Sequence, residues 1–295
     1  MKSIGLDIGG TNIKGAVIDD KGEILRTYIR KSNYYVNDYT KNIVEIIDEL
    51  LNSCNGQVEG IGIGVPGIVD YKKGNIVSCP ALSLVNFNLK KYIEEIFKLK
   101  VKVENDVNAW TIGEKYFGCG KTCTDFIMIT IGTGIGCGIY INDNIYRGAN
   151  FEAGEIGYMP IGLDAYKYQC SNHDFGYFES NASANSVGKK YKEKSGEELE
   201  CKEIFIRAEE GDEVAIDVVE EVYKYLGIGI SAIRCIINPQ KIVIGGGMAN
   251  QGEKLKNEVK ENIKKLIPLN TVIELSKTGE FGGAIGSAKM NFIKC

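Results

Sequence analysis

Three glycine clusters stand out in the 295-residue sequence, because each follows an apolar run typical of a strand. They are DIGGTNIKG at 7–15, GTGIGCG at 132–138 and GGG at 245–247. Glycine lets a backbone bend tightly, and successive N–H groups inside such a bend form a concavity that binds anions. Together the three clusters predict a backbone site for phosphates, although tight turns alone would explain any one of them.

Known glycine motifs narrow the kind of phosphate site. A dinucleotide-binding fingerprint needs a helix after its glycines, but the cluster at 132–138 is followed by IYIND, a strand and a turn. The sequence also lacks the G-x-x-x-x-G-K-[ST] pattern of a P-loop. We therefore predict β-hairpins that clamp phosphate, to which the hydroxyls of Thr11 and Thr133 add hydrogen-bond donors.

The first cluster, at 7–15, also contains two charged residues. Asp7 stands at the end of a strand-like run, where a carboxylate can hold Mg²⁺, directly or through water, against nucleotide phosphates. Lys14 lies on the outgoing strand, where it adds positive charge or is an ordinary solvated lysine.

A carboxylate in the stretch VENDVNAW is the candidate general base. Asp106 follows a short apolar strand and precedes a helix, at the strand end where α/β proteins collect ligands. There it takes the proton from an attacking hydroxyl in phosphoryl transfer, or it is only a helix N-cap. A polyol acceptor also needs fixed amides and carboxylates. Asn105, Glu155 and Glu179 are candidates, each of which alone is also explained as a surface residue.

The elements that must position these residues alternate between strands and helices. Apolar spacing predicts helices over 39–53, 88–98, 212–236 and 252–266, and buried strands in KSIGLDI, VEGIGIGV, VKVEN and KIVIGG. The opening segment is also repeated. Shifting it by 123 positions (132 − 9) places Gly9 on Gly132. We therefore predict an α/β protein of two similar domains, each offering one glycine hairpin to a shared cleft, with a boundary near 117–124.

Composition excludes several classes of protein. The net charge is −4 and no basic block occurs, so a nucleic-acid surface has no electrostatic support. No apolar run reaches the roughly 18 residues of a membrane span, and the opening residues do not form a signal peptide. Nine scattered cysteines favour a reduced, cytoplasmic protein. His173, the sole histidine, leaves no room for a histidine-activated nucleophile.

These motifs together resemble the ROK family of sugar kinases and repressors, within the actin/hexokinase-like superfamily. The likeness extends from IGLDIGGTNIKGAVID through VENDVNAWTIGE and ITIGTGIGCGIYINDNIYRGANFEAGEIGYMPI to NPQKIVIGGGM and GGAIGSA. It implies two ribonuclease-H-like (actin/hexokinase-like) domains around an interdomain cleft that binds ATP and a sugar. We expect the first domain over 1–118 with the C-terminal helix, 281–295, and the second over 119–280.

The resemblance also implies a role for each candidate residue. Asp106 becomes the base that takes the proton of a sugar 6-hydroxyl. The ATP-binding residues are Asp7 (with Mg²⁺), Gly9, Gly10, Thr11, Asn12, Lys14, Gly132, Thr133, Gly134 and, for adenosine, Gly245, Gly246 and Gly247. The sugar-binding residues are Gly64, Gly67, Asn105, Asp106, Glu155, Tyr158 and Glu179.

The sequence departs from the family pattern at the structural zinc site. Tyr158 stands where the family usually has a zinc-binding histidine that also contacts the sugar. The segment CSNHDFGYFE at 170–179 keeps Cys170 and Glu179 of the usual motif, with His173 as one possible further ligand. Because a structural zinc site needs four ligands, we predict no zinc. The hydroxyl of Tyr158 takes over the histidine's contact, or the substitution leaves room for a larger group at C1 or C2 of the sugar.

The expected activity is ATP-dependent phosphorylation of a hexose or N-acetylhexosamine, with glucose or N-acetylmannosamine as leading acceptors because Glu179 is retained. Tyr158 and the run LSLVNFNLKKYIEE are instead similar to β-glucoside kinases. A repressor would need a helix-turn-helix before the first glycine motif, which begins within ten residues of Met1. The intact Asp7, Asp106 and hairpins disfavour a non-catalytic sugar sensor. A homodimer is expected from the resemblance.

Overall fold

The computed structural model describes residues 1–32, 39–55, 57–168 and 176–293, and the chain divides into two compact units. Unit 1 consists of Met1–Thr124, Gly138–Ala153 and Ser276–Cys295, and unit 2 of Asp125–Cys137 and Gly154–Leu275. The chain therefore passes from one unit to the other after Thr124, Cys137, Ala153 and Leu275.

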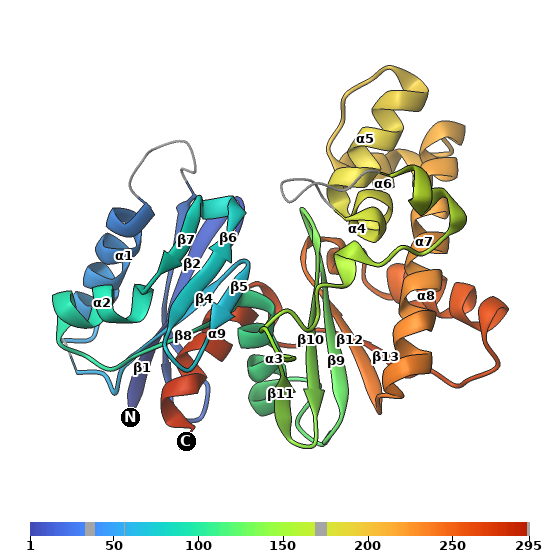
Figure 1. Ribbon diagram of the computed structural model, residues 1–295. Coiled ribbons are helices and arrows are strands. Elements are labelled where there is room, and N and C mark those ends of the chain that lie inside the picture. Colours follow the sequence, from blue (N-terminus) through green and yellow to red (C-terminus); the bar gives the residue numbers. More distant parts are fainter. Residues whose placement is uncertain (33–38, 56, 169–175, 294–295) are drawn as a thin grey trace. The chain divides into compact units, whose positions relative to one another are not determined.

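Strands and helices alternate along the chain, as the sequence predicted (Figure 1). The strands are β1 (Lys2–Ile8), β2 (Asn12–Asp19), β3 (Ile24–Lys31), β4 (Ile61–Val65), β5 (Ile68–Asp70), β6 (Asn75–Cys79), β7 (Leu84–Phe87), β8 (Val101–Asn105), β9 (Phe126–Ile131), β10 (Ile135–Ile141), β11 (Asn144–Tyr146), β12 (Lys241–Gly245) and β13 (Ile273–Leu275). The α-helices are α1 (Tyr39–Ser53), α2 (Leu89–Phe97), α3 (Asp106–Phe117), α4 (Tyr177–Ala182), α5 (Ala184–Ser195), α6 (Cys201–Glu210), α7 (Glu213–Ile237), α8 (Glu253–Leu266) and α9 (Gly282–Lys289).

Two five-stranded sheets share one topology, which confirms the predicted internal repeat. The first has the order β3-β2-β1-β4-β8 and the second β11-β10-β9-β12-β13. In the first sheet β1, β2 and β3 are antiparallel, while β4 and β8 continue from β1 in parallel. In the second sheet β12 is parallel to both β9 and β13. The predicted α/β class is thus confirmed, and a three-stranded sheet, β5-β6-β7, accompanies the first sheet.

Small residues let α9 lie directly on the first sheet. A Cβ atom at Gly5 or at Gly62 would overlap a backbone carbonyl of α9, that of Ala284 or Ser287. Helix α1 packs instead against β2, where a Cβ at Gly15 would lie 2.7 Å from a methyl group of Leu50. The glycines of β1 and β4 and the small residues of GGAIGSA thus bring the start of α9 to the carboxyl end of β1.

The core of unit 1 forms from the predicted apolar positions. The fully or almost fully buried side chains of β1, α1, β4 and β8 pack in one cluster, including Leu6, Ile46, Ile63 and Val103. In unit 2 the long helix α7, predicted over 212–236, buries an apolar stripe that consists of Ala215, Val218, Val219, Val222, Leu226 and Ile230. Among the described residues, the helices are too short or too polar for any of them to cross a membrane.

Candidate active site

Three parallel strands end side by side and carry the predicted residues of unit 1. In the ladder between β1 and β4, Asp7 pairs with Gly64, and in the ladder between β4 and β8, Val65 pairs with Asn105. Asp7 also lies opposite Lys14 on the antiparallel strand β2. The strand ends therefore bring Asp7, Gly64 and Asn105 to one edge of the sheet, as their places in the sequence predicted.

Asn105, and not Asp106, is the N-cap of α3. Its Oδ1 accepts hydrogen bonds from the backbone N–H groups of Val107 and Asn108, both at 3.0 Å. Its Nδ2 donates to the carbonyl of Gly67 at 3.2 Å and to Oδ1 of Asp106 at 3.0 Å. The interpretation of Asp106 as only a helix cap is therefore wrong. Asn105 instead orients the carboxylate of Asp106 and ties it to the segment that carries Gly67.

The two carboxylates at this edge of the sheet, those of Asp7 and Asp106, have raised pKa values. Loss of solvation raises the pKa of Asp106 to about 6, against the opposing effect of hydrogen bonds from Val107 and Asn105. Loss of solvation and then the charge of Asp106 raise the pKa of Asp7 to about 7, against the attraction of Lys14. Clustered, poorly solvated carboxylates with raised pKa values are typical of active sites.

The surroundings of Asp7 fit a magnesium ion. A Cβ atom at Gly283, in the first turn of α9, would lie 2.5 Å from Oδ2 of Asp7, so only glycine leaves this carboxylate its place. Lys14 donates to the carbonyl of Glu280 at 3.0 Å. Among the described residues, no three carboxylate, cysteine or histidine side chains gather as a metal site. Mg²⁺ needs no such cage, because it is usually held by one or two carboxylates plus waters and substrate phosphates.

The first glycine hairpin forms as predicted between β1 and β2. The N–H of Gly9 donates to the carbonyl of Asn12 at 3.0 Å and closes the bend. Ser32, the residue after β3, donates its hydroxyl to the carbonyl of Gly9 at 2.8 Å and its N–H to the carbonyl of Thr11 at 2.8 Å. Gly10 and Thr11 are exposed at the tip. Ser32, which the sequence analysis missed, holds the hairpin in shape.

The second glycine hairpin forms in unit 2 between β9 and β10. Its bend is closed by the N–H of Gly132, which donates to the carbonyl of Gly134 at 2.9 Å. The carboxylate of Glu179, on α4, accepts the N–H of Ile135 at 2.5 Å. A Cβ atom at Gly134 would overlap that carboxylate. Loss of solvation raises the pKa of Glu179, although this hydrogen bond acts in the opposite direction. Glu179 thus braces the hairpin with one carboxylate oxygen.

Glu155 and Tyr158 lie at the two ends of the short 3-10 helix η2 (Ile156–Tyr158), which packs against α4, the helix that carries Glu179. A Cβ atom at Gly157, between them, would lie 3.3 Å from both the carbonyl of Ile135 and Cβ of Glu179. Burial raises the pKa of the Cys137 thiol to about 12, and the charge of Glu155 adds to this shift. The side chain of Tyr158 is 51% exposed. In unit 2 the three predicted sugar-binding residues are thus carried by η2 and α4, beside the start of β10.

The third glycine cluster follows β12 beside the second hairpin. Gly245 pairs with Thr130 of β9, two residues before Gly132. Gly246 has a left-handed φ of 87°, and a Cβ atom there would lie 2.5 Å from the carbonyl of Ile131. The close approach explains the need for glycine. Unit 2 thus places the hairpin and the GGG turn next to one another.

The residues of the zinc prediction are only partly described. Cys170 and His173 lie outside the described residues, so the absence of zinc stays a prediction. The predicted domain boundaries likewise stay a prediction.

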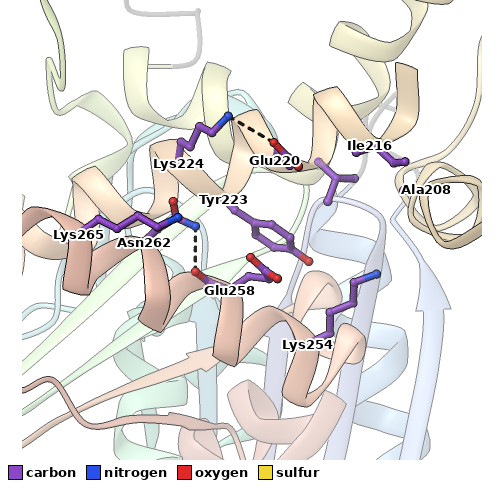
Figure 2. Close-up of a pocket in the computed structure, with 10 residues that line it drawn as sticks. Ala208, Ile216, Glu220, Tyr223, Lys224, Lys254, Glu258, Asn262 and Lys265 are labelled. Atoms are coloured by element: carbon purple, nitrogen blue, oxygen red, sulfur yellow. Dashed lines mark hydrogen bonds and ion pairs between the residues drawn. The ribbon is translucent and has the colours of Figure 1, made fainter. Parts of the chain in front are cut away.

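A pocket of about 300 Å³ lies elsewhere in unit 2, against α6, α7 and α8 (Figure 2). Its lining consists of Ala208, Ile216, Val219, Glu220, Tyr223, Lys224, Lys254, Glu258, Asn262 and Lys265. Tyr223 is only 3% exposed, and its hydroxyl has no hydrogen-bond partner among the described residues. The pocket contains none of the predicted ATP-binding or sugar-binding residues, and the candidate active site does not depend on it.

Comparison with known proteins now places the chain: it belongs to the ROK family, whose model matches residues 3–291. A glucokinase from Halalkalibacterium halodurans is 32% identical over 88% of this chain and 84% of its own length. A beta-glucoside kinase from Listeria innocua is 32% identical over 97% of this chain and 96% of its own. The predicted family is thus confirmed.

Solved structures agree with this family. A putative N-acetylmannosamine kinase from Listeria monocytogenes superposes with a TM-score of 0.88 at 30% identity, covering 99% of both chains. A ROK family glucokinase from Streptomyces griseus, solved with glucose and AMPPNP, superposes with a TM-score of 0.85 at 29% identity, covering 98% of this chain and 99% of that one.

Proposed function

We propose that this chain is an ATP-dependent hexose kinase, which transfers the γ-phosphoryl group of ATP to the 6-hydroxyl of a hexose or N-acetylhexosamine. One observation carries the proposal: the carboxylate of Asp106 stands at the end of β8 with a pKa of about 6, oriented by Asn105 and electrostatically coupled to Asp7. The ROK family, the named glucokinase and the structure solved with glucose and AMPPNP support it.

Asp106 acts as the general base. At neutral pH its carboxylate is mostly ionised, since its pKa is about 6, yet it binds a proton more strongly than an ordinary aspartate. It takes the proton of the sugar hydroxyl as the new O–P bond forms, and the bond between the γ-phosphorus and the bridging oxygen of ADP breaks. The hydrogen bond from Asn105 keeps the carboxylate in one orientation during this step.

The glycine turns bind the nucleotide. The backbone N–H groups of the hairpins at 9–11 and 132–134 hold phosphate oxygens, with Thr11 and Thr133 as further donors. Asn12 and Lys14 support the first hairpin from β2. Asp7 would hold Mg²⁺, which neutralises charge on the transferred group when bound. The turn at Gly245–Gly247 holds the adenosine.

The predicted sugar-binding residues bind the hydroxyls of the sugar. They are Gly64, Gly67, Asn105, Glu155, Tyr158 and Glu179. Because Oε2 of Glu179 accepts a hydrogen bond from the N–H of Ile135, Oε1 is the carboxylate oxygen that remains for the sugar. We propose glucose or N-acetylmannosamine as the acceptor. A β-glucoside is the alternative acceptor, because the half-exposed Tyr158 leaves space for an aglycone and because one relative is named a beta-glucoside kinase.

Three further expectations accompany this proposal. A cytoplasmic location is supported by the nine scattered cysteines, an odd number in a chain of this length. The homodimer and the absence of nucleic-acid partners stay predictions.

An ADP-release assay with Mg²⁺-ATP tests the proposal across glucose, N-acetylmannosamine, fructose, allose and β-glucosides. We expect turnover on at least one of these sugars, with the product phosphorylated at the 6-hydroxyl by NMR. A protein that binds ATP but turns over none of these sugars would contradict the proposal and favour a sugar sensor.

A further inference from the structure

Arg147 contacts both the buried Glu104, beside the candidate base, and the partly exposed Tyr71. Its Nε and Nη2 both donate to Oε2 of Glu104, at 2.8 Å and 2.6 Å. Its guanidinium lies over the ring of Tyr71, with Cζ 3.8 Å from the ring centre. Arg147 therefore joins the loop after β11 to β8 and to the turn between β5 and β6, all of them within unit 1.

Glu104 links Arg147 to Asn105, because its carboxylate accepts hydrogen bonds from both residues. Its second oxygen, Oε1, accepts the backbone N–H of Asn105 at 3.0 Å and the side-chain amide of Asn108 at 3.2 Å. Asn105 in turn donates to Oδ1 of Asp106. A continuous series of hydrogen bonds thus runs from Arg147 through Glu104 and Asn105 to the base.

The carboxylate of Glu104 needs the charge of Arg147, because the Glu104 side chain is only 2% exposed. A buried carboxylate is costly without a partner charge, and Arg147 is its ion-pair partner among the described residues. Arginine suits this position better than lysine, since its planar group stacks on an aromatic ring and at the same time donates two hydrogen bonds to Oε2 of Glu104.

The same residue anchors the segment that leads to Glu155. The carbonyl of Arg147 accepts the N–H of Ala153 at 3.1 Å and closes the loop 147–153. Within this loop Phe151 has a left-handed φ of 65°, which is strained for a bulky residue. Its ring packs edge-on against Tyr71 at 6.1 Å between centroids, which holds it there. Ala153 is the last residue before the chain enters unit 2, where Glu155 lies.

We propose that Arg147 is a positioning residue for sugar phosphorylation, and this inference rests on the proposed function. Through Glu104 it fixes Asn105 and hence the orientation of Asp106, and through its own backbone it anchors the segment that carries Glu155. Replacing the side chain of Arg147 should therefore lower kcat and change the KM for the sugar. The KM for ATP should stay nearly unchanged.

The test compares Arg147→Met, Arg147→Lys, Glu104→Gln and the double variant Glu104→Gln/Arg147→Met. Arg207→Met is the matched control, because Arg207 also pairs with a glutamate, Glu197, and lies over a tyrosine ring. We expect Arg147→Met and Glu104→Gln to lower kcat by about 10- to 100-fold, and the double variant to lose little more than the worse single one. Arg147→Lys should recover part of the loss, and Arg207→Met should behave as wild type.

Amide hydrogen exchange gives a readout that does not need activity. We expect the amides of residues 105–108 to exchange about tenfold faster in Arg147→Met than in wild type, because their hydrogen-bond acceptors lose support. If wild type phosphorylates no sugar, the proposed function fails and the exchange experiment still decides the role of Arg147. If Arg147→Met does not fold, Arg147→Lys and the isosteric Glu104→Gln replace it. Wild-type kcat, sugar KM and exchange in folded variants would overturn the inference.

Discussion

The charge of Asp106 raises the pKa of Asp7, although the two residues are 99 positions apart (106 − 7) in the sequence. The carboxyl ends of β1 and β8, with β4 between them, bring the two side chains together. Two poorly solvated carboxylates at one sheet edge give the site a pH dependence, a response to cations and a cost in stability, each of which can be measured.

The activity should fall in acid as Asp106 becomes protonated. Its pKa of about 6 means that sugar kcat/KM is nearly constant above pH 7 and falls about tenfold per pH unit well below 6. The measurement is kcat/KM for the best sugar from pH 5 to 8.5 at saturating Mg²⁺-ATP. A profile that stays flat down to pH 5 would remove Asp106 from the role of base.

Asp7 should destabilise the folded protein at neutral pH in the absence of Mg²⁺ and nucleotide. Its pKa rises from 3.8 to about 7 on folding, so the folded state binds more protons than the unfolded chain between these values. The stability that this group contributes is complete below pH 3.8 and is lost as the pH rises through 7. Asn carries no charge at either pH.

Asp7→Asn should therefore raise Tm relative to wild type at pH 8, by about 2 °C or more, and much less at pH 4.5. Thermal unfolding of both proteins at the two pH values, without Mg²⁺ or ATP, checks this. An equal difference at both pH values would show that the charge of Asp7 is not the cause.

Gly283 should be required for the function of Asp7. In Gly283→Ala the new methyl group would lie 2.5 Å from Oδ2 of Asp7, so the carboxylate or the start of α9 must move. We expect the Mg²⁺ concentration for half-maximal activity to rise about tenfold or more, because a displacement of 1 Å at an active site is costly. Gly188→Ala in α5 is the control, since its nearest neighbour would lie at 3.1 Å. Equal Mg²⁺ dependence in the two variants would contradict the prediction.

Glu114 should contribute strongly to stability without taking part in catalysis. This fully buried carboxylate, near the end of α3, accepts hydrogen bonds from the hydroxyls of Ser276 and Thr278 and from the N–H of Cys119. Glu114→Ala leaves these donors without a partner, at a cost of about 3 kcal/mol or more. Denaturant unfolding measures the loss. Glu197→Ala, which removes an exposed carboxylate, should change stability little, and equal losses would contradict the argument.

Sequence patterns predicted the strand ends and the hairpins because their signals are local. An apolar run followed by glycines marks both hairpins, and a strand followed by a helix marks Asp106. The sequence offered Asp106 as a possible N-cap, but the structure has Asn105 in that place. Both side chain types cap helices well, so only their hydrogen bonds separate them. Local pattern therefore located Asp106 but left its role open.

The supporting contacts could not be predicted, because they join segments that are distant in the sequence. Glu104 and Arg147 are 43 positions apart and read as ordinary charged residues. Glu114 reaches Thr278 across 164 positions. Helix α5, with the polar sequence ANSVGKKYKEKS, has too few apolar positions to show a helical stripe. Pairing and packing, and not periodicity, determine these parts of the structure.

The most direct test of the central claim is the turnover of Asp106→Asn. This variant keeps the size of the side chain and the neighbours of Asn105, but it cannot accept the proton of the sugar hydroxyl. We predict that it binds sugar and ATP with nearly wild-type affinity by calorimetry, while kcat for sugar phosphorylation falls by about 10²- to 10⁴-fold. A folded Asp106→Asn protein that retains wild-type kcat would contradict the account.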